Sequence, residues 1–113
     1  MYEVYWEKLQ YPLLRESSAT TLSDIHDGSL IKNLTRPGYF LSKPEHAALI
    51  LNTDGVQAFN SSKHSIWPVY LTVANLPPEI RMNERNILLA SVWFGPHKPS
   101  DMSLILEPVT SCI

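Results

Sequence analysis

The sequence predicts an α/β domain in which a three-stranded antiparallel meander is followed by a helix. The first observation is a set of apolar, β-rich runs at residues 47–53, 65–76 and 87–94. The second is that short polar stretches separate these runs, which favours antiparallel connections over crossovers. The third is a helix N-cap sequence at residues 99–101, followed by apolar residues up to Val109.

The composition limits the classes of protein to consider. A chain of 113 residues is the size of one domain. Nine Lys and Arg and eleven Asp and Glu give a net charge of -2, and both signs occur throughout the sequence. Dedicated nucleic-acid-binding domains are usually basic, so this balance predicts weak or no DNA binding. The sequence shows no membrane-spanning run and no secretory leader, and its one cysteine, Cys112, excludes an internal disulfide.

Residues 1–46 are predicted to form an irregular region that precedes a domain at residues 47–113. The apolar residues between positions 2 and 14 do not decide between helix and strand. Residues 23–28 have the Asx and glycine chemistry of turns. The apolar residues between positions 30 and 34 fit a short helical turn, and the Arg-Pro-Gly sequence at 36–38 ends it.

The three apolar runs are expected to have different environments. Residues 47–53 are predicted to form a buried strand that ends at Asp54-Gly55, a dipeptide typical of hairpin turns. The second run has Pro68 near its start, where a missing N–H costs least. The third run is continuously apolar, which predicts a central strand. Pro108 limits the regularity of the helix that follows.

Asp54 is the first candidate for chemistry. It follows a predicted strand, and a carboxylate at a strand end is well placed to meet other carboxylates around Mg²⁺. The alternative is that Asp54 only shapes a turn, as Asp-Gly pairs commonly do in hairpins. On spacing alone, the turn is the favoured interpretation.

Other residue types give weaker signals. No two histidines have the spacing of a helical metal site, so all four are predicted to be exposed loop residues: His26, His46, His64 and His97. Cys112 is poorly placed for a catalytic thiol, and no serine lies in a nucleophile elbow. The aromatic residues of the strand-like runs are predicted to be core residues rather than a base-stacking platform: Trp67, Tyr70, Trp93 and Phe94.

Several short segments occur in a fixed order along the chain. They are TDGV at 53–56, SSK at 61–63, SIWPV at 65–69, NLPP at 75–78, NILL at 86–89, GP at 95–96 and KP at 98–99, with DIHDGSL upstream at 24–30. This ordered set resembles the start of the catalytic domain in eukaryotic cut-and-paste transposases of the CACTA (En/Spm) kind and their animal relatives.

The resemblance implies an RNase H-like fold and DDE/D chemistry. In that chemistry three acids hold two Mg²⁺ or Mn²⁺ ions, which promote DNA strand cleavage and transfer. The resemblance makes Asp54 the first of the three acids. It matches no residue to the other two, and four further acids stay outside the prediction: Glu79, Glu84, Asp101 and Glu107. It also implies DNA as the partner of intact family members and a nuclear location.

The predicted meander and helix form only the opening of such a fold. A crossover helix normally leads to a further strand, which this sequence does not supply. We therefore expect an incomplete RNase H-like domain that is inactive alone and marginally stable. One alternative is an interaction module whose exposed sheet edge accepts a strand from a partner or a second copy. Another is DNA binding without catalysis.

Overall fold

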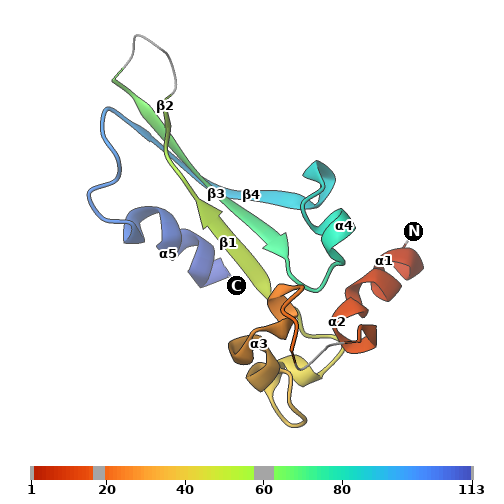
Figure 1. Ribbon diagram of the computed structural model, residues 1–113. Coiled ribbons are helices and arrows are strands. Elements are labelled where there is room, and N and C mark those ends of the chain that lie inside the picture. Colours follow the sequence, from red (N-terminus) through yellow and green to blue (C-terminus); the bar gives the residue numbers. More distant parts are fainter. Residues whose placement is uncertain (1, 17–19, 58–62, 113) are drawn as a thin grey trace. The chain divides into compact units, whose positions relative to one another are not determined.

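The computed structural model describes residues 2–16, 20–57 and 63–112 (Figure 1). The chain forms two compact units. The first unit contains Met1–Ile50 and Val73–Asn86, and the second contains Leu51–Thr72 and Ile87–Ile113. The boundary between residues 46 and 47 stays a prediction.

The first unit is built from short helical elements. They are α1 (Tyr2–Leu9), α2 (Tyr11–Leu14), η1 (Ile25–Asp27), α3 (Ser29–Leu34), η2 (Phe40–Ser42), α4 (Pro78–Arg81) and η3 (Glu84–Asn86). The expectation of an irregular region at 1–46 is therefore too coarse. Pro12 lies in the first turn of α2, where its missing N–H breaks no helical hydrogen bond. The helical turn expected near residues 30–34 is confirmed as α3.

The strands form one antiparallel sheet, which confirms the predicted meander. The strands are β1 (Leu49–Thr53), β2 (Val56–Gln57), β3 (Ser65–Val73) and β4 (Ile87–Gly95). β3 is central, because β4 pairs with it over most of its length while β1 and β2 pair along its other edge. β1 and β2 therefore act as one interrupted edge strand, so the sheet is three strands wide.

The interruption between β1 and β2 has a physical cause. Ala74 N–H donates to the Ala48 carbonyl, and Val56 pairs with Ile66, so one register runs through both edge strands without a net shift. That register puts Asp54 opposite Pro68. By the alternation of an antiparallel ladder, residues 54 and 68 form a pair that should exchange hydrogen bonds. Pro68 has no N–H to donate, so the ladder breaks at Asp54-Gly55.

Three strand expectations are wrong. Asp54-Gly55 is not the hairpin turn, because β2 continues the edge after it and the chain reverses only between Gln57 and Ser65. β4 is not central, since within the described residues it pairs with β3 alone. β1 is also less buried than expected, because it is an edge strand with a largely exposed surface.

The core of the second unit lies between the sheet and α5 (Ser103–Cys112) (Figure 1). It consists of Val69, Leu71, Ile105 and Val109, with four partly buried residues against them: Trp67, Trp93, Met102 and Leu106. Two of the four predicted core aromatics, Trp67 and Trp93, thus join the core, whereas Tyr70 and Phe94 are exposed. The helix predicted after residue 99 is confirmed, and the Asp101 carboxylate accepts a hydrogen bond from the Ser103 N–H near its start.

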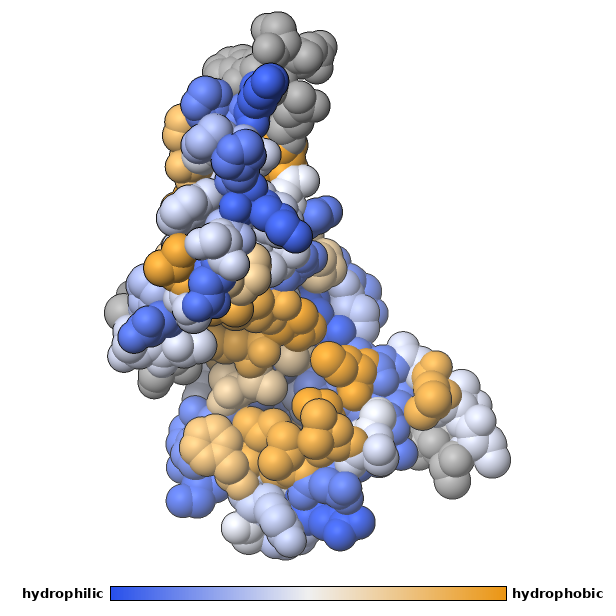
Figure 2. Space-filling view, turned by 90° about the vertical axis from the view of Figure 1, so that its left-hand side faces the viewer, coloured by the Kyte–Doolittle hydropathy of each residue, from blue (hydrophilic) through white to orange (hydrophobic). Residues whose placement is uncertain are grey.

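Many large apolar side chains stay exposed in both units. Figure 2 shows patches of hydrophobic side chains on the face that it presents, interrupted by hydrophilic ones. β4 contributes several of the exposed apolar side chains of the second unit, including Leu89 at 60% and Phe94 at 59% exposure. In the described parts of the chain, no helix is long and apolar enough to cross a membrane.

Candidate active site

Asp54 lies in the gap between β1 and β2 and is exposed to solvent. One of its carboxylate oxygens, Oδ1, accepts a hydrogen bond of 2.8 Å from the Gly55 N–H. This local bond, to the N–H of the next residue, orients the carboxylate and involves only one of its two oxygens. The candidate acid is therefore oriented and accessible.

The residues on either side of Asp54 are closely packed or contain buried polar atoms. A Cβ added at Gly55 would come within 2.5 Å of two ring atoms of Trp67, so this position accepts no side chain while the indole stays in place. Thr53 Oγ1 and Trp67 Nε1 are buried and have no hydrogen-bond partner in the structure. Buried polar atoms usually find a partner, so these two unsatisfied groups mark an unusual environment beside the candidate acid.

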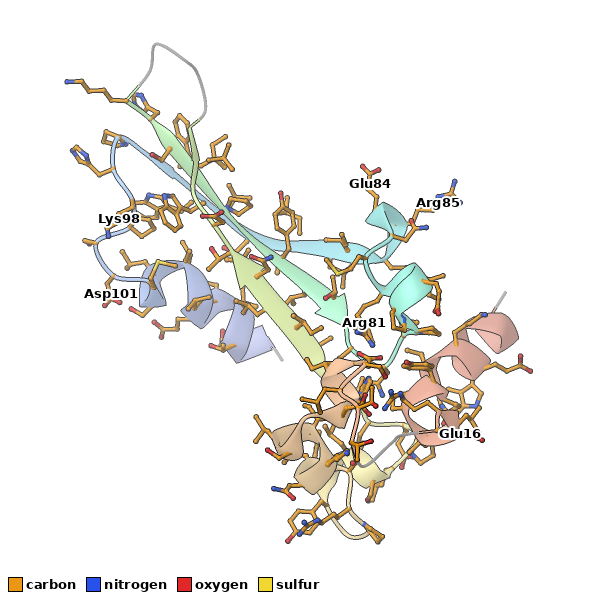
Figure 3. All side chains as sticks on the ribbon, viewed as in Figure 1. Glu16, Arg81, Glu84, Arg85, Lys98 and Asp101 are labelled. Atoms are coloured by element: carbon orange, nitrogen blue, oxygen red, sulfur yellow. The ribbon has the colours of Figure 1, made fainter. Side chains whose placement is uncertain are left out.

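The described residues do not bring a metal-binding set to Asp54. Among residues 2–16, 20–57 and 63–112, no group of three His, Cys, Asp or Glu side chains could hold a metal ion. Four further acids were left outside the prediction of catalytic residues. Of these, Asp101 accepts a hydrogen bond near the start of α5, and Glu79, Glu84 and Glu107 are exposed. Figure 3 shows Glu84 and Asp101 pointing away from the ribbon.

The histidines do not form a site, but they are not all simple loop residues. His26 is only 8% exposed, and its Nε2 lies 2.7 Å from the Ala74 carbonyl oxygen. Because a carbonyl only accepts, Nε2 carries the hydrogen. His46 stacks on Phe40, and His64 stacks on Phe94. The prediction of four exposed histidines is therefore wrong for His26, which the fold uses to satisfy the end of β3.

Sequence reasoning missed a set of ion pairs in the first unit. We call Tyr11, Arg15, Asp24, Asp27 and Arg81 the ion-pair cluster. Arg81 donates to both oxygens of Asp24 at 2.8 and 3.0 Å, and Arg15 donates to both oxygens of Asp27 at 2.5 and 3.0 Å. Such paired hydrogen bonds between guanidinium and carboxylate are strong and directional. Residues 24 and 27 were predicted only as turn formers, and they also form a capping box around η1.

The two carboxylates of the cluster are held in their charged form. Burial alone would raise the pKa of Asp24, but hydrogen bonds from Arg81 and Tyr11 outweigh this effect and lower the pKa to about 2. Arg15 and the backbone N–H of Ser23 hold the pKa of Asp27 well below its usual range. Burial, followed by the hydrogen bond to Asp24, raises the pKa of the Tyr11 hydroxyl.

The cluster joins segments that are distant in the sequence. Besides Asp24, Arg81 donates to the backbone carbonyls of Ala74 and Leu76. Arg81 is the last residue of α4, and Figure 3 shows it on this helix, in the segment that follows β3. The upstream DIHDGSL segment thus has a structural role: its His26 binds Ala74, which follows β3 directly, and its Asp24 binds Arg81 at the end of α4. The only sequence signal for this role was the pair of aspartates around a histidine.

Comparison with models of protein families shows which family the chain is related to. The sequence model of the transposase family tnp2 matches residues 20–112. The chain belongs to the tnp2 transposase family. No curated protein and no solved structure matches it.

The match has a bearing on the candidate site. It includes the DIHDGSL segment, Asp54 and the whole of β1 to β4, so both units contain residues of the tnp2 family. This confirms the resemblance to En/Spm-like transposases that the ordered segments predicted. Intact members of this transposase family act on DNA.

Proposed function

We propose that this tnp2 family chain carries the opening of an RNase H-like, DDE/D-type catalytic domain with Asp54 as its first acid. The observation that carries the proposal is the position of Asp54, which is exposed at the end of an edge strand that Pro68 interrupts. The order of strands and helix, and the resemblance to CACTA transposases, support it. The hairpin interpretation of Asp54-Gly55 no longer competes, because the chain does not reverse there.

A divalent metal pair does not fit the described residues alone. Mg²⁺ and Mn²⁺ favour carboxylate oxygens, and Asp54 offers them, but one carboxylate supplies too little charge and too few ligands for two ions. We therefore propose that the 113-residue chain is inactive by itself. Two further carboxylates, from additional sequence or from another chain, are required before Asp54 takes part in DNA cleavage.

The metal part of the proposal can be tested without activity. Mn²⁺ is added to the ¹⁵N-labelled chain, and paramagnetic broadening of amide signals is followed by NMR. We expect weak binding that broadens Gly55 first and that Asp54→Asn removes. Glu107→Gln is the matched control, because it removes an exposed acid from α5 in the same unit. Broadening that survives Asp54→Asn would show that Asp54 is not a metal ligand.

The catalytic part is tested with DNA carrying the ends of a tnp2-family transposon. The 113-residue chain with Mg²⁺ should cut none of it. In a longer reading frame that supplies two more strand-end carboxylates, Asp54→Asn should lower cleavage at least about 100-fold, as expected for loss of an essential catalytic group. Specific cleavage by the 113-residue chain would overturn the proposal of inactivity.

A second candidate function is an interaction module. The specific observation is β4, whose far edge pairs with no strand among the described residues and which exposes Leu88, Leu89, Val92 and Phe94. An unpaired edge next to apolar side chains favours strand addition by a partner or a second copy. This function requires neither Asp54 nor a metal ion.

A further inference from the structure

One surface segment of the first unit has an unusual composition. Residues 28–44 contain Lys32, Arg36 and Lys43 and no Asp or Glu. We call residues 32–43 the basic loop. The whole sequence has nine Lys and Arg against eleven Asp and Glu, so its composition does not reveal this local excess of positive charge.

The structure shows where the neighbouring acids are used. The carboxylates of Asp24 and Asp27 are buried and bound by Arg81 and Arg15, so their charges are neutralised within the ion-pair cluster. Within the described ranges, Lys32, Arg36 and Lys43 pair with no carboxylate. The basic loop therefore presents positive charge that is not cancelled by ion pairs.

Two of the three cations border hollows that share one lining residue, Thr35. Thr35 and Lys32 line a hollow of about 130 Å³ beside His26 and Arg15. Thr35 and Lys43 line a second hollow, with Ile31 and Leu41. Lys32 and Lys43 thus each line a hollow that Thr35 also lines, and Arg36 follows Thr35 in the chain.

The backbone of the basic loop is held in one conformation. Tyr39 N–H donates to the Arg36 carbonyl at 3.0 Å, and Gly38 has φ +88°, as in a type II turn with proline before glycine. Ser42 then binds the Tyr39 carbonyl through both its N–H and its hydroxyl. A ligand would therefore meet a surface that is already ordered, which lowers the entropic cost of binding.

Two aromatic side chains are displayed on the same loop. Tyr39 is 55% exposed and Phe40 is 66% exposed. His46 stacks against Phe40, with ring centroids 4.2 Å apart, and supports this ring from one side. Exposed aromatic rings among unpaired cations are the combination that binds single-stranded nucleic acids, because bases stack on the rings while the cations contact phosphates.

We propose that the basic loop binds single-stranded DNA, with Lys32, Arg36 and Lys43 on the phosphates and Tyr39 stacking on a base. This inference goes beyond the proposed function, since it requires neither Asp54 nor a metal ion. It differs from the expectation of weak or no DNA binding, which rested on the net charge and on the even distribution of charges along the sequence. A duplex keeps its bases stacked inside, so the aromatic contact selects unpaired DNA.

The test is fluorescence anisotropy with the 113-residue chain and a labelled ten-nucleotide oligothymidine, at several salt concentrations. We expect log Kd to change with log salt with a slope of about 2, from three phosphate contacts at about 0.7 each. Arg36→Gln and Lys43→Gln should each weaken binding several-fold at low salt and reduce the slope by about 0.7. Tyr39→Ala should weaken binding about 10-fold and leave the slope unchanged.

Matched controls remove one exposed cation from other places. The two control substitutions are Arg85→Gln, in η3, and Lys98→Gln, between β4 and α5. Both residues are exposed and are labelled in Figure 3. Each should change the affinity less than 2-fold. Gly38→Ala adds no clash but strains the turn, so it should weaken binding without any change of charge.

The proposal fails if the control variants weaken binding as much as the loop variants, or if Tyr39→Ala has no effect. It also fails if duplex DNA of the same sequence binds more tightly than the single strand, or if inorganic polyphosphate binds equally well. Single-stranded RNA is a separate arm: tighter binding of RNA than of DNA would overturn DNA as the ligand. Circular dichroism melts confirm that each variant stays folded. Loss of oligothymidine binding leaves the Mn²⁺ test of Asp54 unaffected, so the two proposals fail independently.

Discussion

Asp54 and Gly55 illustrate how far single residues can be interpreted from sequence. The dipeptide predicts a hairpin turn, and that prediction is wrong. The determining residue is Pro68, which lies 14 positions away in the sequence and opposite Asp54 in the sheet. Its missing N–H breaks the ladder, and only a register known from the structure reveals that pairing. The sequence predicts that Gly55 is needed for a hairpin turn. The structure gives a different reason, because a Cβ at this position would clash with the Trp67 indole.

Gly55 gives a direct prediction at this scale. A Cβ at position 55 would lie 2.5 Å from Trp67 Cε2 and Cζ2, so Gly55→Ala must displace the indole or the edge strand. We expect the free energy of unfolding to fall by about 1–3 kcal/mol, as for other overpacked sites. Urea denaturation followed by tryptophan fluorescence measures this loss.

The cause of that loss can be isolated with a second substitution. Trp67 Nε1 has no hydrogen-bond partner, so Trp67→Phe removes no hydrogen bond. The substitution replaces the indole that lies against Gly55 with a smaller ring. In the Trp67→Phe background, Gly55→Ala should cost clearly less than in the wild type, which is a favourable coupling in a double-mutant cycle. An equal cost in both backgrounds would show that the Trp67 contact is not responsible.

At the scale of elements, local composition predicted most of the second unit. β1, β3, β4 and α5 all lie at or within a few residues of the predicted runs, because β-rich segments and an Asp N-cap are local signals. The environment of each strand was harder to predict. A continuous apolar run indicates a central strand only when both edges and both faces are covered, and β4 lacks a second strand partner among the described residues.

The ion-pair cluster could not be predicted, because its partners are far apart. Asp24 and Arg81 are separated by 57 residues, and neither has a local motif that indicates the other. The same holds for His26 and the Ala74 carbonyl, which are 48 residues apart. These contacts hold η1 beside the segment that connects β3 with α4. The candidate binding surface on the basic loop could not be predicted from the sequence either. It depends on which carboxylates are already bound in ion pairs, and only the structure shows this.

The cluster predicts an acid-sensitive first unit. Asp24 has a pKa of about 2 in the folded chain against a reference value of 3.8, and Asp27 is also depressed. A depressed carboxyl pKa contributes stability that is fully present above the unfolded value and is lost as the pH falls through the folded one. The free energy of unfolding should therefore stay nearly constant above about pH 5 and decrease between about pH 4 and pH 2. Urea titrations at each pH, followed by NMR signals of residues 23–28, measure it.

The variant Asp24→Asn tests whether this carboxylate causes the pH dependence. It should be less stable than the wild type at pH 6, because Arg81 then lacks its partner, and it should lose less stability on acidification. Glu45→Gln removes an exposed acid from the same unit and should keep the wild-type profile. A profile of Asp24→Asn parallel to that of the wild type would contradict the assignment.

At the scale of the whole molecule, the chain buries little apolar surface for its composition. Among the residues that the structure describes, six hydrophobic ones are buried: Val69, Leu71, Ala74, Leu76, Ile105 and Val109. Large side chains such as Leu88, Leu89, Val92 and Phe94 stay exposed along β4. Contiguous exposed apolar surface usually marks an interaction site or a tendency to associate. This balance is the physical basis for the expected marginal stability, and it makes association the property to measure.

We expect the chain to self-associate through β4 at micromolar concentrations. Two unpaired β4 edges can form an antiparallel ladder and cover apolar side chains on the same strand. Light scattering after gel filtration should give a mass that rises from monomer to dimer with concentration. Leu89→Lys introduces a charge on the exposed side of β4 and should shift the protein to monomer, whereas Leu22→Lys, at an exposed position outside the sheet, should not. If both variants associate like the wild type, β4 is not the interface. If β4 is the interface, a cooperative melt of the dimer favours the interaction module. Disordered aggregation of the chain instead favours an incomplete catalytic domain.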